Sequence, residues 1–337
     1  MYEQQPTGFG YEPSVDMNKA KRKFLRSGAN YAGFFMLVLV GSLQLAFPII
    51  LLVLSAFGVV TGDAINDATL GLGNTVYLLI YSVVYVLAMG APLLLLLGKR
   101  GFNPLSPRNC VHAGVGAFGF LSAVGTCMLA NIITSFILFF FSQFGVESEP
   151  PPSMMENTPI SFVLNLFVMA VLPAILEELV FRGCVLRVLR PYGDLYAIAI
   201  SAVLFGLMHG NLRQIPFATI VGFVLGYLYV VTGNIWMPIL VHFTNNAISV
   251  VSEYLSFSLT EEQSSNMYVS VILQLIVVGI VAVALLFGCF WRRLKLRKSG
   301  TGLSFGSRTL SLITAPALIG AVALFVMLMI WEMQLNG

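Results

Sequence analysis

Long apolar runs divide the chain into about nine segments that are separated by short polar stretches. The runs cover roughly residues 29–60, 75–97, 113–144, 160–181, 196–208, 217–231, 235–255, 269–290 and 310–331. A helix needs about 20 apolar residues to cross the hydrocarbon layer of a membrane, and most of these runs are close to that length or longer. We therefore predict an all-α protein, a polytopic transmembrane helical bundle with about nine spans.

The composition excludes a water-soluble enzyme and a disordered chain. Of the 337 residues, 58% are hydrophobic and 10% are charged, whereas about 25% of the residues in a soluble domain are charged. The net charge of +3 is too small to indicate nucleic acid, so membrane lipid is the expected surrounding. The four cysteines form no CxxC pair, and we interpret them as small hydrophobic residues.

Basic residues gather in alternate polar segments, which predicts an orientation. Positive charge favours the cytoplasmic ends of spans. With a cytoplasmic N-terminus the inner segments are 17–28, 98–112, 182–195, 232–234 and 291–309. The outer ones are 61–73, 145–159, 209–215 and 256–268, which hold acidic residues and a single Arg213. We predict a cytoplasmic polar and basic tail over 1–28, N-terminal spans over 29–159, a core over 160–255 and C-terminal spans over 256–337.

Ionisable residues at membrane depth concentrate between about residues 170 and 250. They are Glu177, Glu178, Arg182, His209, Arg213 and His242. Such groups cost at least a few kcal/mol each in lipid, so they indicate a functional site. Glu177 and His209 each lie 16 residues from the predicted turn at Gly193, so an antiparallel hairpin brings them to one depth.

Three short motifs stand in this window, and together they resemble a known family. Glu177-Glu178-Leu-Val-Phe-Arg182 resembles EExxxR, Phe205-Gly-Leu-Met-His209 resembles FxxxH, and His242-Phe-Thr-Asn-Asn246 resembles HxxxN. In this order they resemble the CPBP family of intramembrane proteases, which comprises the type II CAAX prenyl endopeptidases and the Abi bacteriocin-processing proteins. The resemblance covers about residues 160–255.

The resemblance implies an intramembrane endopeptidase that cleaves a membrane-associated peptide or protein. It implies that Glu177 and His209 activate water, while His242 and Asn246 stabilise the oxyanion. The spacing of four residues predicts an ion pair between Glu178 and Arg182, and Phe205 is expected to support the site by packing.

Whether a metal takes part stays open at this point. Glu177, His209 and His242 supply the ligand types of a catalytic zinc site, but the sequence has no HExxH motif. The expected cofactor is therefore none or zinc.

Other functions use the same residues differently. The chain could be a non-catalytic membrane scaffold or a bacteriocin-immunity protein, or a transporter in which Glu177 carries protons. An alternative without a functional site places Glu177 and Glu178 at a solvated helix end and His209 in an outer loop. Convergence of Glu177, His209 and His242 distinguishes a catalytic site from these alternatives. The expected location is a membrane, with a bacterial plasma membrane favoured.

Overall fold

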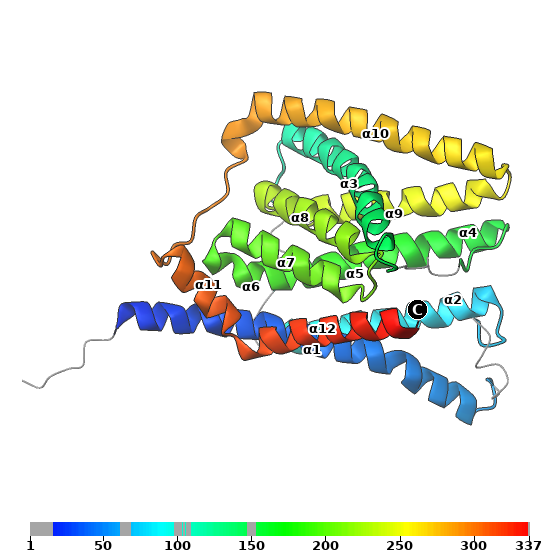
Figure 1. Cartoon of the computed structure of the whole chain (residues 1–337), viewed down its shortest axis with the longest axis horizontal. Coiled ribbons are helices and arrows are strands. Elements are labelled where there is room, and N and C mark those ends of the chain that lie inside the picture. Colours follow the sequence, from blue (N-terminus) through cyan, green and yellow to red (C-terminus); the bar gives the residue numbers. More distant parts are fainter. Residues whose placement is uncertain are drawn as a thin grey trace, which may run out of the picture.

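The protein is built from helices (Figure 1). The computed structural model describes residues 16–60, 69–97, 103, 105, 109–146 and 153–335, and these contain no strand. The predicted all-α class is therefore confirmed for the described residues. The helices are α1 (Met17–Ala56), α2 (Asn74–Leu97), α3 (Ala113–Ser142), α4 (Pro159–Asn165), η2 (Leu166–Val171), α5 (Leu172–Val180), η3 (Phe181–Leu186), α6 (Arg187–Leu189), η4 (Arg190–Tyr192), α7 (Asp194–Met208), α8 (Ile215–Thr232), α9 (Trp236–Ser256), α10 (Glu261–Phe290), η5 (Trp291–Arg293), α11 (Phe305–Ile313) and α12 (Pro316–Leu335).

The predicted count of nine spans is not confirmed. Within the described residues, five helices are long and apolar enough to cross a membrane, or six if α11 and α12 form one broken span. The described apolar part of α2 and the whole of α7 are shorter than a full span. Helix α9 does not qualify either, because it carries polar residues such as His242 and Asn246.

The helices differ from the predicted apolar runs in two places. The described part of the predicted tail is helical from Met17, because the Asp16 side chain accepts from the backbone N–H groups of Asn18 and Lys19 and caps α1. The predicted span 310–331 is broken into α11 and α12, which meet at 66°. Pro316 has no N–H and disfavours the helical conformation of the residue before it, so the chain bends there.

Helix pairs that approach closely define the bundle. Helices α3 and α10 run antiparallel and cross where Gly125 meets Gly279; a Cβ atom on Gly125 would lie 2.5 Å from the Gly279 Cα atom. Small residues permit such close backbone contact in membrane helix pairs. Helix α5 lies among α2, α9 and η3, so the residues of the predicted site are surrounded by protein.

The predicted inner segments lie together at one end of the molecule. The Arg26 side chain donates to the Thr314 hydroxyl, the Arg187 side chain to the Asn103 carbonyl, and the Asp194 N–H to the Arg297 carbonyl. The Asn109 N–H likewise donates to the Gly233 carbonyl. This grouping agrees with the charge pattern but does not establish which side of a membrane this end faces. The basic pair at residues 99–100, the acidic and proline-rich segment 147–152 and the first 15 residues lie outside the described part of the chain.

Candidate active site

A locally distorted helix carries the two glutamates. Residues Pro159–Tyr192 form one continuous helical stretch in which two π-helical turns, η2 and η3, flank α5 on either side. π-Helical turns inserted in a helix change the direction of the following side chains, and they are frequent at functional sites. Glu177 and Glu178 lie in the short α-helical piece between these turns, and both side chains are buried.

A cavity of about 380 Å³ collects the residues of all three motifs. Its lining includes Glu177, His209, His242 and Asn246, which come from α5, the end of α7 and α9. At 1.5 Å per residue, the 15 residues of α7 span only about 22 Å, less than the roughly 30 Å thickness of the hydrocarbon layer. The α7–α8 turn therefore ends short of the far ends of α9 and α10 (Figure 1). His209, which follows α7, lines the same cavity as Glu177 of α5.

Glu178 binds two partners through one oxygen atom. Its Oε1 accepts from Arg182 Nη1 at 2.7 Å and from His242 Nδ1 at 2.9 Å. The other end of the guanidinium group donates to the Gly222 carbonyl at 2.8 Å, and its Cζ atom lies 4.8 Å from the centre of the Phe205 ring. The predicted Glu178–Arg182 ion pair and the packing role of Phe205 therefore agree with the geometry. The added contact to His242 fixes the orientation of its imidazole ring, as carboxylates do for catalytic histidines.

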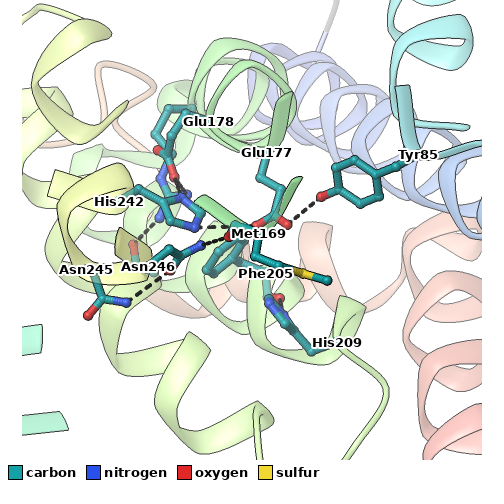
Figure 2. A network of polar contacts seen from close by, with 11 residues as sticks. Tyr85, Met169, Glu177, Glu178, Phe205, His209, His242, Asn245 and Asn246 are labelled. Atoms are coloured by element: carbon teal, nitrogen blue, oxygen red, sulfur yellow. Dashed lines mark hydrogen bonds and ion pairs between the residues drawn. The ribbon is translucent and has the colours of Figure 1, made fainter. Parts of the chain in front are cut away.

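Glu177 has one bound and one free carboxylate oxygen (Figure 2). Tyr85 of α2 donates its hydroxyl to Oε1 at 2.6 Å. Oε2 is buried and has no hydrogen-bond partner among the described residues, and it lies 3.9 Å from His242 Nε2. A buried carboxylate oxygen without a donor is costly, which marks this atom as a place where a further polar group binds.

His209 is held in one ring orientation. Its Nδ1 lies 2.9 Å from the Phe205 carbonyl oxygen. A carbonyl can only accept, so Nδ1 carries the proton in this contact and Nε2 is left for other interactions. The Phe205 ring stands edge-on to both His209 and His242, with centroid distances of 5.2 and 5.9 Å, and so separates and supports them.

Asn246 ties α9 to the distorted helix. Its Nδ2 donates to the Met169 carbonyl at 3.0 Å, and its Oδ1 accepts from Asn245 Nδ2 at 3.1 Å. Pro173, four residues after Met169, has no N–H and cannot satisfy that carbonyl. Asn246 thus fills a gap in the backbone bonding of η2 while it lines the cavity.

The structure brings together the residues that the motifs singled out, but their catalytic roles stay predictions. It also adds Tyr85, which the sequence analysis missed. Tyr77, Tyr81 and Tyr85 recur every four residues in α2 and line one side of an otherwise aliphatic helix. That stripe is a polar signal in a membrane helix and could have identified the residue.

The predicted zinc ligands do not form a metal-holding group in the described residues. No set of three His, Cys, Asp or Glu side chains there is placed to hold an ion. Glu177, His209 and His242 line the same cavity, and the bonds to Phe205 and Glu178 engage only Nδ1 of each histidine, so they do not decide whether Nε2 binds a metal. We derive no catalytic step through a metal, and the zinc set stays a prediction.

Comparisons with known proteins agree with the motifs. Residues 159–248 match the sequence model of the family described as type II CAAX prenyl endopeptidase Rce1-like. The chain is 25% identical over 175 residues to the Bacillus subtilis (strain 168) protein named "Putative membrane peptidase YdiL". The aligned residues make up 52% of this chain and 71% of that protein. No solved structure gives a significant match. The family resemblance predicted from the three motifs is therefore confirmed over these residues.

Proposed function

We propose that this chain is an intramembrane endopeptidase that hydrolyses a peptide bond in a membrane-associated peptide or protein. The observation that carries the proposal is the unbonded, buried Oε2 atom of Glu177, which lies 3.9 Å from His242 Nε2 in a cavity that His209 also lines. The match to the CAAX prenyl endopeptidase family and the similarity to a protein named as a membrane peptidase support the same reaction class.

The distance between these two atoms suits one shared water molecule. Two polar atoms 3.9 Å apart can both reach an oxygen atom at about 2.8 Å from each, which is an ordinary hydrogen-bond length. A water molecule there would donate one proton to Glu177 Oε2. In the proposed reaction Glu177 takes that proton as the oxygen atom attacks the peptide carbonyl carbon, and His209 Nε2 orients the water from across the cavity.

The same residues can complete the hydrolysis. The attack turns the carbonyl oxygen into an oxyanion, which Asn246 would stabilise by donating its second Nδ2 hydrogen. His242 would donate from Nε2, which requires a proton on both ring nitrogens, the imidazolium form, because the Glu178 carboxylate accepts from Nδ1. The C–N bond then breaks, and the proton held by Glu177 passes to the leaving amine. Products are a carboxylic acid and an amine, so one water molecule is consumed and the carboxylate of Glu177 is restored.

The surroundings of the cavity favour a substrate that reaches it within the membrane layer. The walls contributed by α1 and α2 include Leu43 and Met89, and the opposite wall includes Phe217. An apolar wall facing a polar cluster suits an extended segment with apolar side chains and a central peptide bond. We propose a bacterial plasma membrane as its location, which the similarity to the Bacillus subtilis relative supports.

The proposal is tested by cleavage assays in proteoliposomes. The purified full chain and its Glu177→Gln variant are incubated with a library of membrane-inserting peptides, and the products are identified by mass spectrometry. We expect cleavage by the wild type and at least a 100-fold loss in Glu177→Gln, because a positioned general base contributes about 10²–10⁴-fold. Glu262→Gln, which changes an exposed carboxylate in the first turn of α10, is the matched control.

Two outcomes would contradict the proposal. One is identical products from the wild type and Glu177→Gln, which would assign the cleavage to a contaminant or to another site. The other is the absence of any product from a library that includes CAAX-type C-termini, which would favour a scaffold or an immunity protein. Parallel reactions with a chelator, and with zinc restored, test the zinc-dependent version of the same hydrolysis.

A further inference from the structure

Helix α2 contributes a residue to the candidate active site from outside the region of the family match. Tyr85 lies 92 positions before Glu177, and its hydroxyl donates to Glu177 Oε1 at 2.6 Å. In Figure 2 the phenol reaches the glutamate from the side opposite His242. The two oxygens of Glu177 therefore face different partners: Oε1 faces the phenol, and Oε2 faces His242.

We infer that Tyr85 is a positioning residue for Glu177, and that helices α1 and α2 therefore form part of the site. The inference rests on the proposed function for the chemistry that Glu177 performs. The Glu177 carboxyl group is attached to the backbone through two CH2 groups. It can rotate unless a hydrogen bond fixes one of its oxygens. The bond from Tyr85 engages Oε1 and so leaves Oε2 as the oxygen that can accept a proton from water.

A stack of aromatic rings restrains Tyr85 itself. The Tyr77 and Tyr81 ring centroids are 6.5 Å apart at 21° between the planes, and those of Tyr81 and Tyr85 are 6.1 Å apart at 19°. Phe47 of α1 packs edge-on against Tyr77 with a centroid distance of 6.4 Å. Ring pairs of this kind stabilise each other beyond the area they bury. The stack therefore holds the last phenol toward Glu177.

A second contact keeps α2 in place at the level of Tyr85. The Ser42 hydroxyl of α1 donates to the Ala88 carbonyl at 2.7 Å, one turn beyond Tyr85. Helix α2 also packs directly against α5, which carries Glu177. The position of the phenol is thus fixed by α1 and α5 together, which are elements on both sides of α2.

The test uses Tyr85→Phe, which removes the hydroxyl and keeps the ring. Cleavage of a peptide found in the library assay is measured in proteoliposomes. We expect kcat to fall by about 10–100-fold, because misplacing a catalytic group by about an ångström costs rates of that order. KM should change less than twofold, since the phenol holds the base and not the substrate. Tyr77→Phe is the matched control, because it removes a hydroxyl from the same stack away from Glu177.

A double-mutant cycle distinguishes positioning from general support of the fold. Tyr85→Phe is expected to lower Tm by about 1–4 °C in the wild type and by less than 1 °C in the Glu177→Ala background, where the acceptor is gone. Equal losses in both backgrounds would overturn the inference. Unchanged kcat in Tyr85→Phe, with an active wild type, would overturn it as well and leave the proposed function intact. An inactive wild type would instead refute the proposed function, and the cycle alone would then decide whether Tyr85 holds Glu177.

Discussion

At the scale of single residues, Glu178 has a different role from Glu177 although both are buried carboxylates. Its Oε1 accepts from Arg182 and from His242, whereas Glu177 accepts from Tyr85 and lines the cavity. Side chains at consecutive helix positions point about 100° apart, which is why adjacent glutamates meet different neighbours. Glu178 therefore stabilises a buried cation and orients a histidine at the same time.

We predict that Glu178→Ala destabilises the fold by about 3–5 kcal/mol, because it leaves the fully buried Arg182 without its counter-charge. Removing both charges in Glu178→Leu/Arg182→Met should recover most of that loss, since an apolar pair of similar volume tolerates the same surroundings. Cleavage should stay low in the double variant, because His242 still lacks its partner. Thermal unfolding and cleavage rates measure the two effects separately.

Recovery of both stability and activity in the double variant would show that His242 does not need Glu178. Failure to recover stability would show that the pair contributes more than charge balance, for example through the bond from Arg182 to the Gly222 carbonyl.

The sequence revealed the ionisable residues of the site, and the motifs added Phe205 and Asn246, but Tyr85 was missed. Glu177, His209 and His242 stood out because ionisable groups are rare in membrane helices. Tyr85 is compatible with a membrane helix as an amphipathic aromatic residue, and its partner is 92 positions away. The contact between Glu178 and His242 was not predictable either, because it depends on how α5 and α9 pack and on the π-helical turns around α5.

At the scale of elements, the apolar pattern located the helices well and their ends less well. The predicted runs 75–97 and 196–208 match α2 and α7 within two residues. Helix α1 instead begins well before the predicted run, because a helix can extend into water on a capped and charged turn. The break at Thr314 to Pro316 was missed because apolar residues continue on both sides of it.

The crossing of α3 and α10 gives a prediction at this scale. Gly279→Ala should destabilise the protein by about 1–3 kcal/mol, because the added methyl group would meet the backbone of Gly125, with 2.7 Å between its Cβ and the Gly125 Cα atom. Gly288→Ala in the same helix has open space around its Cβ atom and is the control; we expect it to be neutral or slightly stabilising. Thermal unfolding in one detergent compares the two variants. Equal stability of Gly279→Ala and the wild type would show that α3 and α10 can move apart without cost.

At the scale of the whole molecule, the two ends differ in charge. The basic segments near Arg26, Arg187 and Arg297 are linked by side-chain and backbone bonds at one end. At the opposite end of the molecule, α10 starts with Glu261 and Glu262. This asymmetry is what the positive-inside rule uses, and it predicts that the basic end faces the cytoplasm.

Cysteine labelling in sealed, right-side-out vesicles can test this orientation. Cys110 is exposed and lies at the basic end, where neighbouring His112 packs on Phe290 at the end of α10. Ser265 is exposed in the first turns of α10, at the other end of the same helix. Because α10 is long enough to cross the membrane, we expect these two positions on opposite sides. A membrane-impermeant maleimide should therefore label Ser265→Cys in intact vesicles and should reach Cys110 only after the vesicles are opened.

Cys127 is fully buried and should stay unlabelled in both conditions until the protein unfolds. Labelling of Cys110 in intact vesicles, with protection of Ser265→Cys, would reverse the orientation and would move the expected side of substrate access with it.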